Sequence, residues 1–408
     1  MPGQALVGVR VIDFTWVGVG PLLTKYLADF GAEVIRIESR TRLDSFRYAP
    51  PFVGERPGIE GSGHFLNLNT SKYHVTLNLN HPKGRDLAYR LIAGADVVAE
   101  NFTPRVLEKW RLTYDELRRA KPVLVMISLS MHGRTGPYRD ARGFGTVLQA
   151  AAGLASLTGW PDRPPAIPGA AYTDWTTPLF GLVALLAALD YRQRTGQGQY
   201  IEVSNLEAGV QCLETAILDY TVNGRIQQRA GNEWMVGDLP GAAPHGVYRC
   251  LGTERWCAIA VLNDRDWQRF CEVLGRPPWA QEPRFATVLS RVKHRDELNA
   301  LVEAWTSRQP AEEVMARLQA AGIAAGVVQN AADLACDPQL DHRGQAVFLD
   351  HPVVGVQRYD APAFQLAASP ARQRPVPTLG QHNAYVYKGL LGLSEAEYDA
   401  LEAEGVFE

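Results

Sequence analysis

Asp174 is the carboxylate of this chain that is best placed to react. It stands shortly before Thr177-Pro178, and Thr and Pro are favoured at the N-cap and the first position of a helix. The run Leu179–Leu189 has no charged residue, which predicts a helix that begins at Thr177-Pro178 and is buried on most sides. A carboxylate with an ordinary pKa of about 3.9 is ionised at neutral pH, so Asp174 can attack as a nucleophile without a histidine base. The alternative is that Asp174 only caps the helix.

The residues after this run predict where the helix ends. Arg192 and Arg194 suit the negative end of the helix dipole, and Gly196 and Gly198 interrupt the helical pattern. Tyr200–Val203 then predicts a short strand, and a further helix is expected from Ser204 to about residue 222.

A βαβ unit at the start of the chain is the first of the elements that must position Asp174. The apolar strand Val9–Phe14 is followed by Gly18, Gly20 and a helix to Asp29, and then by the strand Glu33–Glu38. Such a unit implies a parallel sheet with a right-handed crossover. The glycines do not form a GxGxxG motif, but they allow an anionic ligand to approach a helix N-terminus.

The alternation of strands and helices continues and predicts a doubly wound α/β domain. Further strands are expected at Val75–Leu79, Asp96–Glu100 and Leu124–Leu129, with helices at Gly84–Ala93 and Tyr114–Ala120. In such sheets ligands bind beyond the carboxyl ends of the strands. Residues 40–64 are rich in Pro, Gly and charge, which predicts a long surface loop.

A Gly/Pro-rich stretch suggests a division of the chain. We expect residues 1–222 to form the first part of the large α/β domain, 223–328 a smaller α/β domain with its linkers, and 329–408 a return to the large domain. The stretch Gly237–Gly246 is a candidate for a loop that covers the active site, or else an ordinary linker.

Composition limits the partners and the compartment. A net charge of −3, 46% hydrophobic and 21% charged residues indicate a globular protein whose main partner is neither nucleic acid nor a membrane. The start of the chain has no pattern of a signal peptide, and the longest apolar run is shorter than the about 20 residues that span a bilayer. The five cysteines form no CxxC pair, which favours reduced thiols and a cytoplasmic location. The spacing of the histidines indicates no metal site.

An ordered set of local patterns resembles the family III CoA-transferases, the group that includes formyl-CoA and carnitine CoA-transferases and the 2-methylacyl-CoA racemases. The patterns cover essentially the whole chain: VRVIDFTWVGVGP, LADFGAEVIRIE, LNLNTSKYHVTLNL, ADVVAENFTP, GRTGPYRDARGFG, YTDWTTP, ALDYRQRTGQGQYIEVSNLEA, RAGN and TLGQHNAYVYKGLLGLSEAEYDALEAEGVF. The TDW and GWPD details are most similar to members that act on aromatic succinates, such as the succinyl-CoA:benzylsuccinate CoA-transferases.

The resemblance implies the chemistry of Asp174. At the matching position the family has a catalytic Asp that attacks an acyl-CoA thioester to give an anhydride, and the released CoA thiolate then converts the anhydride into an aspartyl-CoA thioester. The acceptor carboxylate repeats these steps in reverse. The surrounding glycines can supply backbone N–H groups to the thioester oxyanion. A CoA thioester is the substrate, and no metal and no tightly bound cofactor is implied.

The resemblance also suggests which residues contact CoA, at the ends of the first strands and in the DARGFG loop. Arg40 is equally explained as a solvated surface residue. Many transferases have Gln at the position of Gly18, so that side-chain contact is missing here. The candidates are Val17, Gly18, Arg40, Asn101, Phe102, Arg105, Lys109 and Arg142.

Two other functions fit the same family. A racemase needs two acid/base groups on opposite faces of the substrate carbon. In that branch a His stands near Gly143-Phe144, where this chain has RGFG, and His132 lies well before that point. A non-catalytic subunit of a heteromeric transferase typically lacks the Asp, and Asp174 is present. Glu207 matches a family feature, but a salt bridge or a helix cap explains it as well.

The resemblance further implies an assembly. Family members form a dimer of two interlocked rings, in which the active site lies between the large domain of one subunit and the small domain of the other. A homodimer is therefore expected, or a heteromer with a similar subunit. Four side chains could contact a carboxylate or aromatic acceptor, although core packing explains the tryptophans equally well: Arg47, Tyr48, Trp160 and Trp175.

Overall fold

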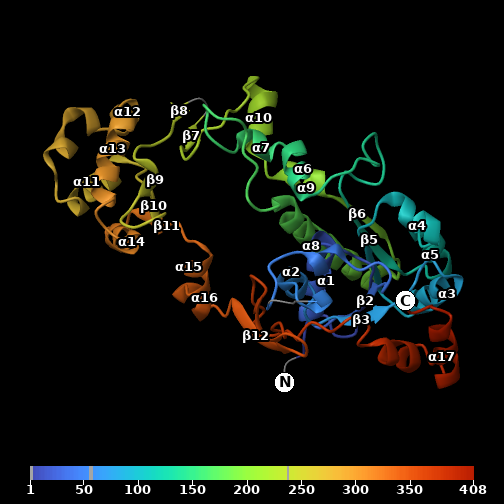
Figure 1. Cartoon of the computed structure of the whole chain (residues 1–408). Helices are drawn as coiled ribbons and strands as arrows, with labels where there is room; N and C mark the ends of the chain where they lie inside the picture. The colour runs from blue at the N-terminus through green and yellow to red at the C-terminus, as the bar shows by residue number, and fades with distance from the viewer. Residues whose placement is uncertain (1–2, 55–57, 237–238) are drawn as a thin grey trace. The chain divides into compact units, whose positions relative to one another are not determined.

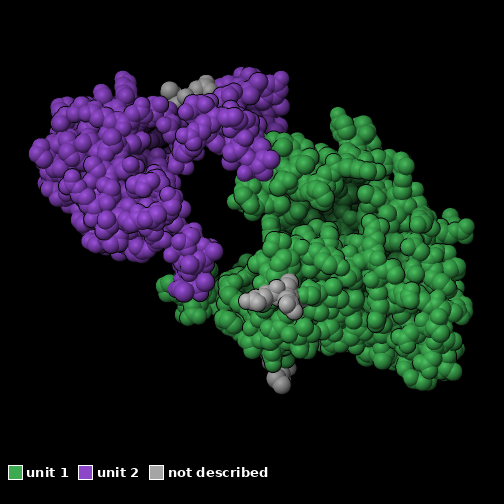
Figure 2. Space-filling view, in the orientation of Figure 1, with its two compact units in different colours: residues 1–153, 168–212, 338–408 green, residues 154–167, 213–337 purple. Residues whose placement is uncertain are grey.

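The computed structural model describes residues 3–54, 58–236 and 239–408, which fall into two compact units. Unit 1 comprises residues 1–153, 168–212 and 338–408, and unit 2 comprises residues 154–167 and 213–337 (Figure 2). The units divide the chain near residues 212 and 337, whereas the sequence suggested boundaries at 222 and 328. They also assign residues 154–167, which interrupt the large domain, to unit 2.

A six-stranded sheet forms the centre of unit 1, with the strand order β3-β2-β1-β4-β5-β6. All five neighbouring pairs are parallel, as the βαβ pattern predicts. The strands are β1 (Arg10–Asp13), β2 (Glu33–Glu38), β3 (Tyr73–Thr76), β4 (Val97–Glu100), β5 (Val125–Ser130) and β6 (Tyr200–Ser204).

Successive side chains of each strand point to opposite faces of the sheet and pack into two separate hydrophobic cores, so both faces of the sheet are buried. Val11 and Val97 belong to the core under α1 (Val19–Asp29) and α8 (Tyr172–Thr195), two helices that pack against each other (Figure 1). Their neighbours in the strands belong to the opposite core. It includes residues of α3 (Pro82–Ala93), α4 (Pro104–Trp110), α5 (Tyr114–Ala120), the π-helical segment η5 (Ala384–Leu390) and α17 (Glu395–Ala403).

The strand order creates a switch point between β1 and β4. The chain moves from β1 through α1 to β2 on one side, and later returns to β4 on the other side of β1. In open parallel sheets the crevice beyond the carboxyl ends of such strands is the usual ligand site. The turn after Asp13 and the segment after Glu100 therefore meet where a ligand is expected.

The helix that carries Asp174 differs from the prediction. Helix α8 begins at Tyr172, so Asp174 lies inside its first turn and Pro178 inside the helix. Because Pro178 has no N–H, the helix lacks the hydrogen bond that this residue would otherwise donate to the carbonyl oxygen of Asp174. The helix is also not buried on most sides, because Leu179, Val183 and other apolar residues are exposed in the single chain.

By length and composition alone, α8 could cross a membrane. It has 24 residues, a mean hydropathy of 1.2 over its most apolar window, and 33% of that window is buried. Its contacts with α1, β5 and β6 are those of a core helix, which passes the same test.

The region 40–64 is not the surface loop that its composition suggested. It contains η1 (Ser45–Tyr48), η2 (Gly58–Glu60) and the start of α2 (Gly63–Leu68). Asp44, Arg47 and Glu60 are buried in it, because each is paired with other charged groups of unit 1. Composition marks these residues as polar, but only the tertiary structure supplies the partners that allow their burial.

The segment after β6 is broken where one helix was expected. It forms α9 (Asn205–Gln211) in unit 1 and α10 (Glu214–Asn223) in unit 2. Two further short helices, α6 (Gly145–Ala151) and α7 (Leu154–Leu157), precede α8.

Unit 2 is a smaller α/β unit with an antiparallel sheet of order β11-β10-β9. The strand at one edge of this sheet is β11 (Ala324–Val327). The elements are β9 (His245–Arg249), β10 (Trp256–Ala260), α11 (Asp264–Val273), η3 (Pro278–Gln281), η4 (Pro283–Phe285), α12 (Val288–Lys293), α13 (Arg295–Thr306), α14 (Ala311–Ala320) and α15 (Ala331–Ala335), with β7 (Met235–Val236) pairing with β8 (Leu239–Pro240). Helix α16 (Pro338–His342) and the hairpin β12 (Ala346–His351) and β13 (Gly355–Asp360) belong to unit 1.

Candidate active site

Two glycine backbones lie beside the carboxylate of Asp174. A Cβ atom placed on Gly145, the first residue of α6, would lie 2.6 Å from Oδ2 of Asp174. A Cβ atom on Gly18, the N-cap of α1, would lie 3.9 Å from the same oxygen. The turn after β1, the start of α6 and the first turn of α8 therefore meet at Asp174.

Asn205, the first residue of α9, is the polar side chain that contacts Asp174. Its Nδ2 lies 3.5 Å from Oδ1 of Asp174 and donates a hydrogen bond to it. The Asn205 side chain is buried, and it follows directly after β6 at the carboxyl edge of the sheet. The interpretation of Asp174 as a mere cap is wrong, because Ala171 is the N-cap of α8.

Burial raises the pKa of Asp174 from its ordinary value to about 6. The sequence suggested an ordinary pKa, since it does not show how much of the carboxyl group is removed from water. At neutral pH the group is still mainly ionised, but it is poorly solvated. A poorly solvated carboxylate is a stronger nucleophile than a fully hydrated one.

The helices α1 and α6 both begin beside this carboxylate, and neither has a capping side chain. The first N–H groups of a helix have no acceptor within the helix itself. Gly18 has no side chain to cap α1, and Phe144, the N-cap of α6, makes no side-chain cap hydrogen bond. Both helix N-termini therefore bring the positive ends of their helix dipoles to the neighbourhood of Asp174, an arrangement that favours negative charge.

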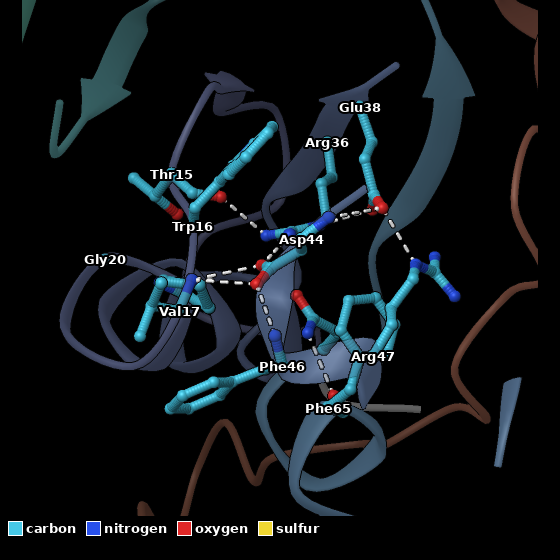
Figure 3. A network of polar contacts seen from close by, with 12 residues as sticks. Thr15, Trp16, Val17, Gly20, Arg36, Glu38, Asp44, Phe46, Arg47 and Phe65 are labelled. Atoms are coloured by element: carbon cyan, nitrogen blue, oxygen red, sulfur yellow. Dashed lines mark hydrogen bonds and ion pairs between the residues drawn. The ribbon is translucent and has the colours of Figure 1, made fainter. Parts of the chain in front are cut away.

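The turn between β1 and α1 is held by side chains from three other segments, and two of these side chains, Arg36 and Asp44, are labelled in Figure 3. Arg36 Nη1 donates to the carbonyl oxygen of Thr15 at 2.7 Å. Asn101 accepts from the Trp16 N–H at 2.8 Å and donates to the Trp16 carbonyl oxygen at 2.7 Å. Asp44 accepts from the N–H of Val17, whose φ of +67° is strained for a β-branched residue by about 1–3 kcal/mol.

The predicted CoA contacts lie at several places of unit 1. Gly18 lies beside Asp174, and Val17 precedes it in the turn after β1. The Asn101 amide holds the Trp16 backbone, and Phe102 packs edge-on against Trp16 and Trp110, with ring centroids 5.7 Å and 5.4 Å away. The structure thus gives both residues a role in shaping the turn after β1, and their contact with CoA stays a prediction.

The four predicted basic contacts are exposed. Arg105 pairs with Asp140 at 3.2 Å, and Lys109 donates to Asn80 at 3.1 Å. Arg40 follows β2, and Arg142 lies in the loop before α6. Contact of these four side chains with the phosphates of CoA stays a prediction.

One of the proposed acceptor contacts is wrong. Arg47 is fully buried and is held by Glu38 at 2.8 Å and Glu60 at 2.9 Å, so it is not available to a substrate. Tyr48 and Trp175 are exposed, and Trp160 belongs to unit 2.

The structure also places Glu207 and His132, two other residues discussed from the sequence. Glu207 is an exposed residue in the first turn of α9, where its N–H bonds to the capping Ser204 side chain. His132 lies in the turn after β5, and its ring stands 6.3 Å from that of Tyr138.

Asn205, Gly145 and Asp44 were missed by the sequence reasoning. Asn205 follows a strand predicted to belong to the sheet, so the rule that ligands bind at carboxyl ends could have found it. Gly145 is part of the RGFG pattern, which was considered only for the missing histidine. Asp44 gave no signal, because a carboxylate in a Pro/Gly-rich segment is usually solvated.

In the part of the chain that the structure describes, no group of three or more His, Cys, Asp or Glu side chains is arranged to hold a metal ion. A partly buried carboxylate at the carboxyl edge of a parallel sheet, facing the N-termini of two helices, is the site of an α/β enzyme. The comparisons with known proteins define this class further.

The chain belongs to CoA-transferase family III, whose model matches residues 6–383. It is 34% identical to the succinyl-CoA–D-citramalate CoA-transferase of Chloroflexus aurantiacus over 99% of this chain and 98% of that protein. It is 32% identical to the beta subunit of the succinyl-CoA–L-malate CoA-transferase of the same organism, with 98% of each chain covered. A CaiB/BaiF family protein from Brucella suis has the same fold, with a TM-score of 0.86 and 31% identity over 95% of this chain and 100% of that one.

The family and these similarities confirm the predicted class and the mixed α/β fold with its large parallel sheet. The chain is an enzyme that transfers CoA from an acyl-CoA to an acid.

Proposed function

We propose that Asp174 carries out this transfer as a covalent nucleophile. An Asp174 oxygen attacks the thioester carbon of the acyl-CoA, the C–S bond breaks, and an aspartyl anhydride and CoA thiolate result. The thiolate attacks Cγ of Asp174, which releases the donor acid and leaves an aspartyl-CoA thioester. The acceptor carboxylate attacks this thioester to form a second anhydride, and the thiolate then attacks the acceptor carbonyl and frees Asp174.

The observation that carries this proposal is the position of the carboxylate. Asp174 is partly buried, and backbones that begin α1 and α6 lie beside Oδ2. Their free N–H groups are suited to stabilise the tetrahedral oxyanion, and the leaving thiolate needs no general acid. Asn205 limits the rotation of the carboxylate through its hydrogen bond to Oδ1.

Succinyl-CoA is the donor that we propose. Two of the similar proteins are named for succinyl-CoA. For the acceptor we propose a carboxylic acid, to be identified from a panel that includes citramalate, malate and benzylsuccinate.

We further propose a homodimer in the cytoplasm, without a tightly bound cofactor. The exposed apolar side chains of α8 support an interface, and five free cysteines are consistent with a reducing compartment. The similarity to a beta subunit makes a heteromer the alternative. The interlocked arrangement of the dimer rests on the resemblance to the family. The covering loop proposed for Gly237–Gly246 begins with two residues outside the described ranges, and its role stays a prediction.

The test is to trap the covalent intermediate. The protein is incubated with succinyl-CoA, quenched with hydroxylamine, and the labelled peptide is mapped by mass spectrometry. We expect a hydroxamate on Asp174 in the wild type and none in Asp174→Asn, which should transfer CoA at least about 1,000-fold more slowly. Asp190→Asn is the matched control, because Asp190 is an exposed residue of the same helix that pairs with Arg194.

Other outcomes point to the alternatives. Wild-type transfer in Asp174→Asn would overturn the mechanism. Deuterium uptake at the α carbon of a 2-methylacyl-CoA, without any hydroxamate, would instead identify a racemase. Binding of CoA without either reaction would indicate a non-catalytic subunit.

A further inference from the structure

We propose that Asp44 is a positioning residue for CoA transfer: its carboxylate fixes Val17 in the left-handed conformation that sets the backbone of Gly18 beside Asp174. This inference rests on the proposed function, since it concerns the place where the thioester would react.

The conformation of Val17 needs an explanation. Its φ is +67°, in a region where a β-branched side chain clashes with its own backbone. A residue stays there only when its surroundings oppose relaxation. A glycine would adopt a positive φ without strain, but the glycine of this turn, Gly18, follows Val17 and does not occupy the strained position.

Asp44 supplies the opposing interaction. The N–H of Val17 donates to both of its carboxylate oxygens, at 3.2 Å to Oδ1 and 3.0 Å to Oδ2. Arg36 Nη2 donates to Oδ2 at 2.6 Å and holds the carboxylate from the opposite side. Figure 3 shows Asp44 between Arg36 and the Val17 backbone.

The same carboxylate also orients a second wall of the site. The N–H of Phe46 donates to Oδ1 of Asp44 at 2.9 Å. A Cβ atom on Gly18 would lie 3.7 Å from the Phe46 ring and 3.9 Å from Oδ2 of Asp174. One carboxyl group therefore fixes both the backbone and an aromatic ring next to the reacting oxygen.

Burial of this charge pair is a poor means of gaining stability. Asp44 and Arg36 are almost fully buried. The free energy of removing two charges from water is about as large as the free energy gained from their attraction. The charges facing Asp44 also include Glu38, whose Oε1 accepts from the Asp44 N–H at 3.0 Å. A buried ionic group that restrains a strained turn at the nucleophile is better explained by preorganisation of the site.

The test compares Asp44→Asn and Asp44→Glu with Glu60→Gln. Asp44→Asn replaces one carboxylate oxygen by an NH₂ group, which faces the N–H donors of Val17 or Arg36. Asp44→Glu keeps the negative charge that pairs with Arg36 but moves the carboxylate oxygens away from the Val17 N–H. Glu60 is a matched control, because it pairs with Arg47 in the neighbouring part of the buried network and does not contact Val17. Steady-state transfer from succinyl-CoA and thermal unfolding are measured for each.

We expect kcat to fall by about 100-fold in Asp44→Asn and by about 10-fold in Asp44→Glu, because the thioester is misplaced by a fraction of an ångström. The KM for the donor should change by less than about 3-fold. The double variant Val17→Gly/Asp44→Asn should recover at least about 10-fold of the lost kcat, since Gly adopts a positive φ without strain. Glu60→Gln should keep kcat within about 2-fold even if it unfolds at a lower temperature.

A second readout does not depend on transfer. Amide hydrogen exchange at Val17 in the free protein should be at least about 10-fold faster in Asp44→Asn or Asp44→Glu than in the wild type and Glu60→Gln. Unchanged exchange, or a kcat loss in Glu60→Gln as large as in Asp44→Asn, would overturn the inference. If the wild type transfers no CoA, the proposed function fails, and the exchange result decides alone whether Asp44 holds the turn.

Discussion

At the scale of the residue, the mechanism that we propose depends on one carboxylate, Asp174, whose charge is partly desolvated. Burial favours the protonated form of Asp174 and raises its pKa to about 6. In the proposed mechanism this cost has a function, because a less hydrated carboxylate reacts with a thioester more readily. The raised pKa has a direct consequence for the pH dependence of transfer.

Transfer should fall as the pH is lowered through about 6. The nucleophile is the ionised form, so below its pKa of about 6 the value of kcat/KM should drop nearly tenfold per pH unit, and above it kcat/KM should level off. The measurement is kcat/KM for the donor between pH 4.5 and 8, with circular dichroism to confirm that the protein remains folded. If kcat/KM stays constant down to pH 5, the pKa of Asp174 has its ordinary value near 4 and the prediction is wrong.

At the scale of the element, the site is made by the ends of short segments. The first turn of α8 carries Asp174, the start of α6 brings Gly145 against it, and the start of α9 supplies Asn205. Helices α6 and α9 both pack on α8. The start of α6 lies so close to Asp174 that a methyl group added at Gly145 should displace the Asp174 carboxylate.

Gly145→Ala tests this close packing. The new Cβ would lie 2.6 Å from Oδ2 of Asp174 and 2.7 Å from Cβ of Ala171, so the carboxylate must move. We expect kcat/KM to fall by about 100-fold or more, with little change in the far-ultraviolet circular dichroism. Gly169→Ala is the control, because its Cβ would meet nothing within 4 Å. Equal activity of the two variants would contradict the described packing.

At the scale of the whole molecule, helix α8 has two different faces. One face packs on α1 and the sheet, where a Cβ on Gly181 would lie 2.7 Å from Leu23. The other face exposes apolar side chains at a helical spacing, namely Tyr172, Trp175, Leu179, Val183 and Leu186. An apolar stripe of this length on a core helix is typical of a surface that is covered by another chain.

The chain should therefore sediment at twice the 44.9 kDa of one copy. Val183→Lys places a charge on the exposed stripe, where Val183 is 70% exposed, and should shift the protein toward monomers by desolvation of that charge. Val356→Lys makes the same substitution at a valine of β13 that is 63% exposed and lies outside the stripe, and it should remain dimeric. Analytical ultracentrifugation at several concentrations distinguishes the two, and a monomeric wild type would exclude the dimer.

The sequence by itself determined the local elements and the class of chemistry. The strand Glu33–Glu38 and the helix Tyr114–Ala120 have the predicted bounds, and α1 ends at Asp29 as predicted. Apolar periodicity, capping residues and glycine turns are encoded within a few neighbouring residues, so they can be recognised without a structure. The ordered family patterns likewise lie along the chain, and they indicated both the α/β fold and Asp174.

Only the tertiary structure decided how these elements make a site. Asp44 meets Val17 across 27 residues, and Asn205 meets Asp174 across 31. The burial of region 40–64, the raised pKa of Asp174 and the strained Val17 all depend on such distant partners. A charged residue is read from the sequence as solvated unless its partner is known, and the partner is fixed by the order of strands in the sheet rather than by local pattern.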